Sequence, residues 1–183
     1  FISEGVTDVD DADFVQVSNI ETIAFSDGNN IALFGANVAN ATSNLTITSG
    51  DGHNTLDASN LGESVTISVG SGNDTILGGT GADSIFGGSG TDSIISGAGA
   101  DVIRYSSGSD LSADTQVDGG SGTDTLLFTI AGVTDVDDAD FVKVTNVEAI
   151  VFGNGNNVAT FGTNAASAVG SLSITGGSGN NTF

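Results

Sequence analysis

The sequence contains no cysteine, proline, methionine or tryptophan. Without cysteine the chain has no disulfide, no thiolate metal site and no thiol nucleophile. The single histidine, His53, leaves no room for a histidine-rich zinc site. Basic residues are nearly as scarce, because Arg104 and Lys143 are the whole supply. A chain of this kind offers no basic face to nucleic acid or to an anionic membrane surface.

Acidic residues, by contrast, are abundant. The 183 residues include 23 Asp and Glu, and the formal net charge is −21 at pH 7. The hydrophobic fraction of 38% is enough to bury a core, so this charge does not indicate a disordered chain. No apolar run approaches the roughly 20 residues that a membrane-spanning helix needs. The composition predicts a folded acidic protein whose charge is neutralised by a cation from outside.

A long internal repeat relates the two ends of the chain. Residues 5–21 and 132–148 read GVTDVDDADFVQVSNIE and GVTDVDDADFVKVTNVE. At this offset of 127 residues, 1–56 align with 128–183 without a gap, and about 33 of the 56 positions are identical. The start at Phe1 rather than Met, and an end inside a motif, favour a window cut from a longer tandem array.

A shorter repeat of nine residues lies inside this period. Its clearest copies are VGSGNDTIL (69–77), GGTGADSIF (78–86), GGSGTDSII (87–95), SGAGADVIR (96–104), the looser YSSGSDLSA (105–113) and, after a shift of five residues, GGSGTDTLL (119–127). Degenerate copies at 49–57, 153–160 and 176–183 carry Asn in place of the Asp. Glycine tolerates positive φ, so each GGxG can form a tight turn that points carbonyls inward, and the following Asp adds a carboxylate. Mixed carbonyl and carboxylate oxygens suit Ca²⁺.

Each turn is followed by a short strand with one large aliphatic residue. These residues are Ile76, Ile85, Ile94, Ile103 and Leu126. One nine-residue unit cannot bury its aliphatic side chain alone, but stacked units can, with about 18 residues in each coil. The spacing therefore predicts a parallel solenoid with aliphatic ladders inside.

Taken together, the nonapeptides resemble the GGxGxDxUx calcium-binding repeat of the RTX family. The resemblance is close over 69–127, and the flanking unit looks like the β-strand repeats between such nonapeptides in very large secreted bacterial proteins. It implies an all-β, right-handed parallel β-solenoid. We expect wider coils at 1–68, a calcium β-roll at 69–127 and the start of a second copy of the period at 128–183.

The family pattern also implies a set of ligands, because each ion bridges one loop and the loop two repeats on. The four implied sets are Gly70, Gly72 and Asp74 with Gly87, Ser89 and Asp92; Gly79, Gly81 and Asp83 with Ser96, Ala98 and Asp101; Gly88, Gly90 and Asp92 with Tyr105, Ser107 and Asp110; and Gly97, Gly99 and Asp101 with Gly119, Ser121 and Asp124. The last set requires that an insertion at 114–118 only widens one coil. The alternative for these Asp residues is turn-stabilising Asx chemistry without a metal. The loops of Asn54 and Asn181 are expected to bind weakly or to close by hydrogen bonds alone.

The acidic TDVDDADF segments at 7–14 and 134–141 leave two interpretations open. An EF-hand is excluded, because its loop needs Gly at the sixth position. The segment is either a helical turn capped by Thr7 or Asp8 with Phe14 buried, or an extra ion site. The residues that follow, 15–25 and 142–152, alternate as strands do.

Glu21 and Glu148 stand at the same position of the two copies of the long repeat. We expect a residue of this type to tie the turn of one coil to its neighbour. A catalytic carboxylate is the alternative, but no partner acid, base or nucleophile stands at a recognisable spacing. His53, in a degenerate Gly turn, is expected to be a solvated loop residue.

No enzyme signature accompanies the repeats. The chain has no HExxH, no GxSxG and nothing near His53 to complete a triad. The sequence therefore predicts a non-enzymatic, calcium-binding structural segment of a large secreted cell-surface protein, such as an S-layer component, a surface filament or an adhesin extender. The resemblance implies type I export and folding outside the cell. The alternative is a module of a secreted hydrolase or polysaccharide-modifying enzyme. Expected partners are Ca²⁺, neighbouring repeats, and further copies or cell-surface glycans, with no nucleic acid and no membrane span.

Overall fold

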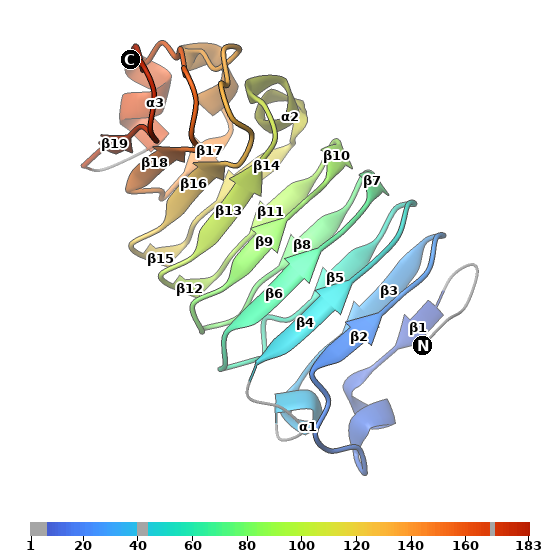
Figure 1. The fold of residues 1–183 in the computed structure, drawn as a ribbon. Coiled ribbons are helices and arrows are strands. Elements are labelled where there is room, and N and C mark those ends of the chain that lie inside the picture. The colour runs from blue at the N-terminus through green and yellow to red at the C-terminus, as the bar shows by residue number, and fades with distance from the viewer. Residues whose placement is uncertain (1–6, 40–43, 169–170) are drawn as a thin grey trace.

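The chain forms a stack of coils that runs from one end of the molecule to the other. The computed structural model describes residues 7–39, 44–168 and 171–183, so the first six residues of the expected first unit lie outside it. Two long parallel sheets face each other, and the chain crosses from one to the other at nearly every turn, with the two termini at opposite ends of the stack (Figure 1). The predicted all-β parallel β-solenoid is thereby confirmed.

The two long sheets share the same pattern of parallel neighbours. Among the described residues, sheet A consists in order of β1 (Thr7–Val9), β3 (Asn30–Leu33), β5 (Thr55–Asp57), β8 (Thr75–Leu77), β11 (Ser93–Ile95), β14 (Gln116–Asp118) and β17 (Val144–Thr145). Sheet B consists in order of β2 (Thr22–Ala24), β4 (Leu45–Thr48), β6 (Val65–Ser68), β9 (Ser84–Phe86), β13 (Val102–Tyr105), β16 (Thr125–Phe128), β18 (Ala149–Phe152) and β19 (Ser173–Thr175).

The core lies between the sheets and is built from aliphatic ladders. In register, Leu56, Ile76, Ile94 and Val117 of sheet A stack on one another, and all are fully buried. Sheet B supplies the facing ladder, which reads Ile23, Ile47, Ile67, Ile85, Ile103, Leu126, Ile150 and Ile174. Burying such a side chain stabilises the fold by about 1.5–3 kcal/mol, so the ladders hold the coils together. The five predicted inward aliphatics are confirmed, each with no exposed surface.

Short elements occupy the turns between the sheets. Two-residue strands pair along the edges of the stack: β7 (Ser71–Gly72) with β10 (Ser89–Gly90), and β12 (Ala98–Gly99) with β15 (Ser121–Gly122). The helical turns are η1 (Asp11–Phe14), α1 (Ala36–Ala39), α2 (Gly108–Ala113), η2 (Asp138–Phe141) and α3 (Thr163–Ala168). The short helix η2 contacts both α2 and α3, while η1 contacts α1, so the helical turns also stack from coil to coil.

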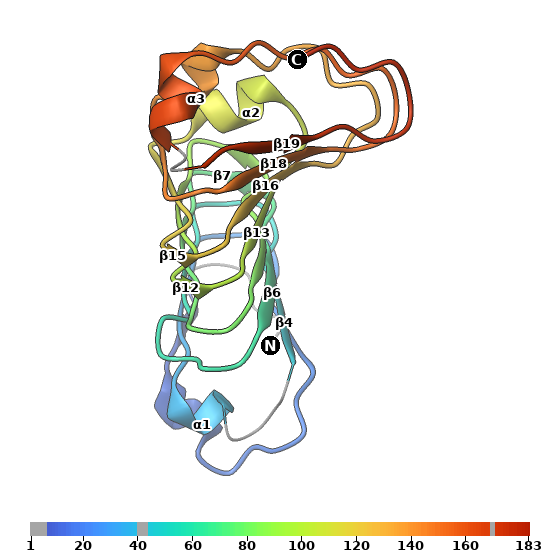
Figure 2. The ribbon, with the colours of Figure 1, turned by 90° about the vertical axis from the view of Figure 1, so that its left-hand side faces the viewer.

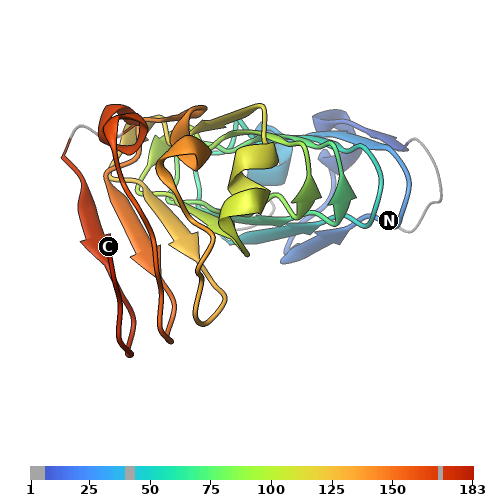
Figure 3. The same cartoon turned by 90° about the horizontal axis from the view of Figure 1, so that it is seen from above.

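The coils are of two widths. Ladder positions are 18 residues apart in the narrowest coils, as from Asp74 to Asp92, and 24 apart in the flanking units, as from Asn30 to Asn54. The spacing is 20 from Asn54 to Asp74, and it widens to 22 and 23 at Asp92–Asp114 and Asp101–Asp124, where α2 is inserted. The wide C-terminal coils reach out sideways beyond the narrow ones (Figure 2), and a view from above shows all of them stacked in order (Figure 3).

The long sequence repeat is also a structural repeat. Val9 pairs with Ala32 in the first copy, and Val136 pairs with Ala159 at the equivalent positions of the second copy. The prediction of strands over 15–25 and 142–152 is only half right. In the first segment only Thr22–Ala24 forms a strand. The second segment contains two short strands, Val144–Thr145 and Ala149–Phe152, separated by a three-residue turn.

Candidate metal sites

The sixth residues of the loops form two ladders along the edges of the stack. On one edge, the backbone N–H of Asp74 donates to Asp92 Oδ1 and that of Asp92 donates to Asp114 Oδ1, each at 2.8 Å. On the other edge, the N–H of Asp83 donates to Asp101 Oδ1, and that of Asp101 to Asp124 Oδ1, also at 2.8 Å. Each carboxylate thus reaches back one coil, and the repeat spacing places it there.

Glycines let successive loops lie almost in contact. Gly72 and Gly90 have φ of 145° and 139°, in a region that L side chains rarely adopt. A Cβ on Gly90 would overlap the carbonyl oxygen of Gly72 in the coil below. The GGxG turns are therefore required by backbone stacking as much as by turn conformation, and they bring main-chain carbonyls close to the Asp ladders.

The second carboxylate oxygen of several ladder residues is buried and unsatisfied. Asp74 Oδ2, Asp101 Oδ2 and Asp124 Oδ2 have no hydrogen-bond partner among the described residues. These side chains are at most 2% exposed. A buried carboxylate without compensation costs free energy, and the whole chain has only two basic residues for 23 acidic ones. The orphaned oxygens therefore fit a bound cation better than a turn closed by hydrogen bonds alone.

The same burial shifts the titration of the ladder. Desolvation raises the pKa of Asp92 to about 7, and the negative charges of Asp114, Asp74 and Asp110 add to the increase. Desolvation also raises the pKa of Asp114 and of Asp124 to about 6. In each case burial disfavours the charged form, and a cation beside these carboxylates would stabilise it.

Side chains alone do not make a metal site. Nowhere in the described part of the chain do three His, Cys, Asp or Glu residues converge on one point. A cation between two loops would therefore take two carboxylates and complete its shell with main-chain carbonyls and water. Calcium accepts six to eight oxygens of this mixed kind.

Three of the four predicted loop pairs lie side by side. Loops 69–74 and 87–92 are joined through β7 and β10. Loops 78–83 and 96–101 are joined by the N–H of Ala98, which donates to Gly79 O at 3.0 Å. Loops 96–101 and 119–124 are joined through β12 and β15. In these pairs the structure brings together the residues that the family pattern implies.

The third predicted pair is arranged differently. Tyr105 is a buried strand residue whose hydroxyl donates to Asp114 Oδ2 at 2.7 Å. Ser107 caps α2, and Asp110 lies within that helix. The ladder position opposite Asp92 belongs to Asp114 rather than to Asp110. The insertion is α2 at 108–113 and not 114–118, so the prediction shifted the register by four residues.

A sequence signal for this shift was present. Ser107 stands three residues before Asp110, which is the spacing of a helix N-cap, and the side chain of Ser107 accepts the N–H of Asp110. Asp114 is followed by Thr-Gln-Val, and Val117 lies in register with Ile94. Reading the Ser as a cap would have assigned the ladder position to Asp114.

The Asn-substituted loops are closed by their own amides. Asn54 Nδ2 donates to Gly50 O at 3.3 Å, Gly52 O at 3.1 Å and Asp74 Oδ1 at 3.0 Å. Asn157 Nδ2 makes the equivalent bonds to Gly153 O and Gly155 O and to Asn181 Oδ1. The amide nitrogen thus lies among loop carbonyl oxygens and a side-chain oxygen of the next coil, which are the kinds of oxygen that the family pattern assigns to a calcium ion.

The TDVDDADF segments form capped helical turns. The cap is Asp10 in the first copy and Asp137 in the second, rather than Thr7 or Asp8, and Asp13 or Asp140 completes a capping box. Phe14 is buried, as predicted. Asp138 accepts the N–H groups of Gly162, Asn164 and Ala165 in the next coil, and the Ala165 bond is the main cause of its lowered pKa.

Glu148 ties neighbouring coils together, as the sequence predicts. Its Oε2 accepts the N–H of Asp124 at 2.8 Å, so it continues the ladder beyond the nonapeptides. His53 is exposed, and its Nδ1 accepts the N–H of Asn73, which gives it a structural role in a surface ladder.

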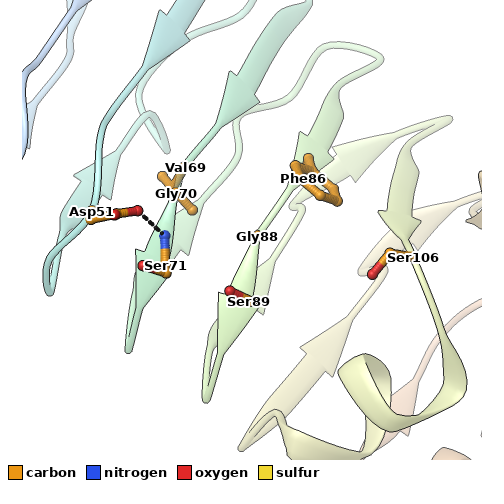
Figure 4. Close-up of a pocket in the computed structure, with 8 residues that line it drawn as sticks. All are labelled: Asp51, Val69, Gly70, Ser71, Phe86, Gly88, Ser89 and Ser106. Carbon is orange, nitrogen blue, oxygen red and sulfur yellow. Dashed lines mark hydrogen bonds between the residues drawn. The ribbon is translucent and has the colours of Figure 1, made fainter.

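A shallow hollow lies across the loops of the narrow coils. Figure 4 shows Asp51, Ser71, Ser89 and Ser106 around it, and Asp51 Oδ1 accepts the N–H of Ser71 at 2.8 Å. That bond lowers the pKa of Asp51. Its described lining brings no base or second acid to Asp51.

Comparison with protein families identifies the narrow coils. A model of the RTX calcium-binding nonapeptide repeat matches residues 66–111 in four copies. The chain carries RTX repeats. Comparisons with curated proteins and with solved structures gave no match. RTX nonapeptides are calcium-binding motifs, so the stacked Asp ladders belong to a calcium-binding repeat segment. The match ends at residue 111, yet loop 119–124 continues the same ladder geometry.

Proposed function

We propose that this chain is a non-enzymatic, calcium-stiffened structural segment of a large secreted cell-surface protein. An S-layer component, a surface filament or the extender of an adhesin fits this description. The observation that carries the proposal is the set of buried, unpartnered carboxylate oxygens at Asp74, Asp101 and Asp124, stacked along the edges of a rod-like solenoid.

Within this proposal, three loop pairs hold calcium: 69–74 with 87–92, 78–83 with 96–101, and 96–101 with 119–124. In each pair the Asp carboxylates supply charge and the Gly-rich turns supply carbonyl oxygens. A bound ion offsets the repulsion between the carboxylates of successive coils and links those coils. Residues 69–127 are then the calcium-dependent part, and 1–68 and 128–183 are the flanking solenoid units.

The charge of the chain favours an extracellular setting. RTX repeats are typical of secreted bacterial proteins. A net charge of −21 opposes compaction, and binding of calcium to the folded state stabilises that state by mass action. Calcium is millimolar outside cells, where this equilibrium favours folding, and export of an unfolded chain by a type I route is consistent with it. No helix in the described ranges is long and apolar enough to cross a membrane.

A calcium titration tests the proposal. Circular dichroism and small-angle scattering are recorded in excess chelator and then with rising Ca²⁺. We expect an expanded, weakly structured nonapeptide region in chelator and a compact rod in calcium. The variants Asp83→Ala and Asp92→Ala should each raise the calcium midpoint, because each removes a ladder carboxylate. A chain that is equally compact and folded without calcium would contradict the proposal.

A further inference from the structure

The ladder of carboxylates continues beyond the last nonapeptide. Beyond loop 119–124, the turn between β17 and β18 is only three residues long, 146–148. Even so, Asp124 donates its N–H to Glu148 Oε2 at 2.8 Å, and Glu148 returns its own N–H to Asp124 O at 3.0 Å. Glu148 therefore occupies the ladder position of the next coil, with a longer side chain that spans the shorter turn.

A main-chain oxygen also points to this place. A Cβ on Gly119 would overlap the carbonyl oxygen of Asn146 and would lie 3.0 Å from Asp124 Oδ2. The two oxygens therefore face the same small space from successive coils. A loop pair within the RTX match places its oxygens similarly, because a Cβ on Gly78 would overlap Ser96 O and would lie 2.7 Å from Asp83 Oδ2. There, however, Asp83 Oδ2 also accepts the N–H of Gly79 at 2.7 Å.

The conformation of Asn146 makes this arrangement possible. Its φ is 54°, in the left-handed region that Asn tolerates better than most residues. Its side-chain Nδ2 donates to Asp118 Oδ1 at 2.8 Å, which fixes the turn. The three-residue turn 146–148 thus places a carbonyl oxygen where a six-residue RTX loop places one.

Asp124 is the group that this space leaves unsatisfied. It has no exposed surface, and its Oδ2 is buried without a partner in the described structure. Burial, together with the charges of Asp101, Glu148 and Asp118, raises its pKa to about 6. An anionic oxygen so placed, with a second carboxylate beside it, lacks only a counter-charge.

We propose that Asp124, Glu148 and the Asn146 carbonyl form a further calcium site, at the junction between the nonapeptide coils and the second copy of the long repeat. Two carboxylates and one carbonyl suit Ca²⁺, with water completing its shell. The inference rests on the proposed function. It makes Asp124 a ligand shared by two successive ions, and it makes the junction between the two kinds of coil calcium-dependent.

The long repeat supplies a matched control. Glu21 occupies the position of Glu148 in the first copy, and Asn19 has φ of 58°, close to that of Asn146. Glu21, however, is exposed, whereas Glu148 is half-buried against Asp124. Glu148→Gln retains an oxygen that accepts the Asp124 N–H but removes the charge. Glu21→Gln makes the same change of charge away from the site.

Equilibrium dialysis with radioactive calcium on the full chain measures ions bound per molecule. At the lowest calcium concentration that saturates the parent chain, Glu148→Gln should bind one ion fewer, and Glu21→Gln should match the parent. Asp124→Asn should lose two ions, because it serves two sites. Circular dichroism in saturating calcium checks that each variant is folded.

The outcomes separate this site from the proposed function. If the parent and Glu21→Gln bind calcium and Glu148→Gln binds the same number of ions with the same affinity, the junction site is wrong and the nonapeptide sites stand. A loss of only one ion from Asp124→Asn would also contradict it. A parent chain that binds no calcium at millimolar concentration would overturn the proposed function together with this site.

Discussion

The narrow nonapeptide coils and the wide flanking coils use the same ladder with opposite chemistry. In both, a side-chain oxygen accepts a backbone N–H from the preceding coil, as at Asp92 and at Asn54. In the wide coils the ladder residue is Asn, whose Nδ2 fills the turn and binds its carbonyls. In the narrow coils it is Asp, and the outer oxygens of Asp74, Asp101 and Asp124 are buried without a partner among the described residues. Asn30 Oδ1, in the first described wide coil, is likewise without a partner there.

This difference shows what the cation is needed for. An amide carries its own hydrogens to the loop carbonyls, so an Asn turn is complete without an ion. A carboxylate has none to offer, so the loop carbonyls of an Asp turn receive no hydrogen bond from this side chain, and a cation can take that place. We therefore infer that one substitution at this loop position shifts a turn between closure by an amide and closure by calcium.

The largest expected effect is a segmental response to calcium removal. Hydrogen exchange measured by mass spectrometry should show strong loss of protection in chelator over 69–124, where the Asp ladders lie. Peptides from 149–160, where Asn157 closes the turn and Phe152 stacks on Phe128 with ring centroids 5.1 Å apart, should remain more protected. Equal loss of protection along the whole chain would show that the two kinds of coil do not differ as inferred.

Replacing the ladder Asn of a wide coil by Asp should make that coil depend on calcium. Asn54→Asp removes the amide that binds Gly52 O and places a carboxylate next to Asp74. We expect the free energy of unfolding to fall by about 1–3 kcal/mol in chelator, because buried carbonyls lose their partner. In calcium most of this loss should be recovered, with one more ion bound.

The control for that exchange is Asn29→Asp, in the stacked turn of the preceding coil. Asn29 is exposed, and its Oδ1 accepts the N–H of His53, which a carboxylate can also do. Urea unfolding with and without calcium should show little change for this variant. If Asn54→Asp lowered the free energy of unfolding equally with and without calcium, the inference that Asp makes this turn calcium-dependent would be wrong.

Most of the fold and most of the ladder follow from the sequence. The nine-residue period fixes which aliphatic residue points inward, because each unit contributes one strand with one buried position, as at Ile85 and Ile103. The period of 127 likewise foretold equivalent turns at Asp11–Phe14 and Asp138–Phe141. Repetition makes such inferences strong, because each copy tests the others.

What the sequence did not reveal lies where the repeat breaks. Helix α2 interrupts the register, so Asp114 takes the position predicted for Asp110. The role of Asp11 is also non-local: it accepts the N–H groups of Gly35 and Asn37, in the next coil. Such contacts depend on how wide a coil is, and coil width is set by three-dimensional stacking rather than by the motif.

The next effect in size is the pH dependence of stability without calcium. Its sign should be opposite to that of a protein stabilised by salt bridges. The pKa values of Asp92, Asp114 and Asp124 are raised to about 7, 6 and 6, above the usual value near 4. Their contribution to stability is therefore complete below pH 4 and is lost as pH rises from 4 to 7. In chelator, the folded fraction of the nonapeptide region, followed by circular dichroism, should therefore be higher at pH 4 and fall as the pH rises to 7.

The variant that tests this pH dependence is Asp92→Asn, which keeps the acceptor for the Asp74 N–H without the titrating group. It should flatten the upper part of the profile, between pH 6 and 7. In calcium the direction reverses, since protons compete with the ion for the same carboxylates, and affinity should fall below pH 7. A folded fraction in chelator that increases from pH 4 to 7 would contradict the inference that burial disfavours the charged form of these carboxyls.

The smallest expected effect concerns the acids that do not serve calcium. Asp138 accepts three N–H groups at the start of α3, and Asp11 does the same for α1, so each anchors the helix of the next wide coil. Asp138→Ala and Asp11→Ala should each lower the melting temperature slightly and by the same amount in calcium and in chelator. This equality separates them from Asp83→Ala, whose effect should be large in calcium and small in chelator. If Asp138→Ala changed the calcium midpoint, the acidic turns of the wide coils would also hold ions. The narrow and wide coils would then not differ in calcium dependence as inferred.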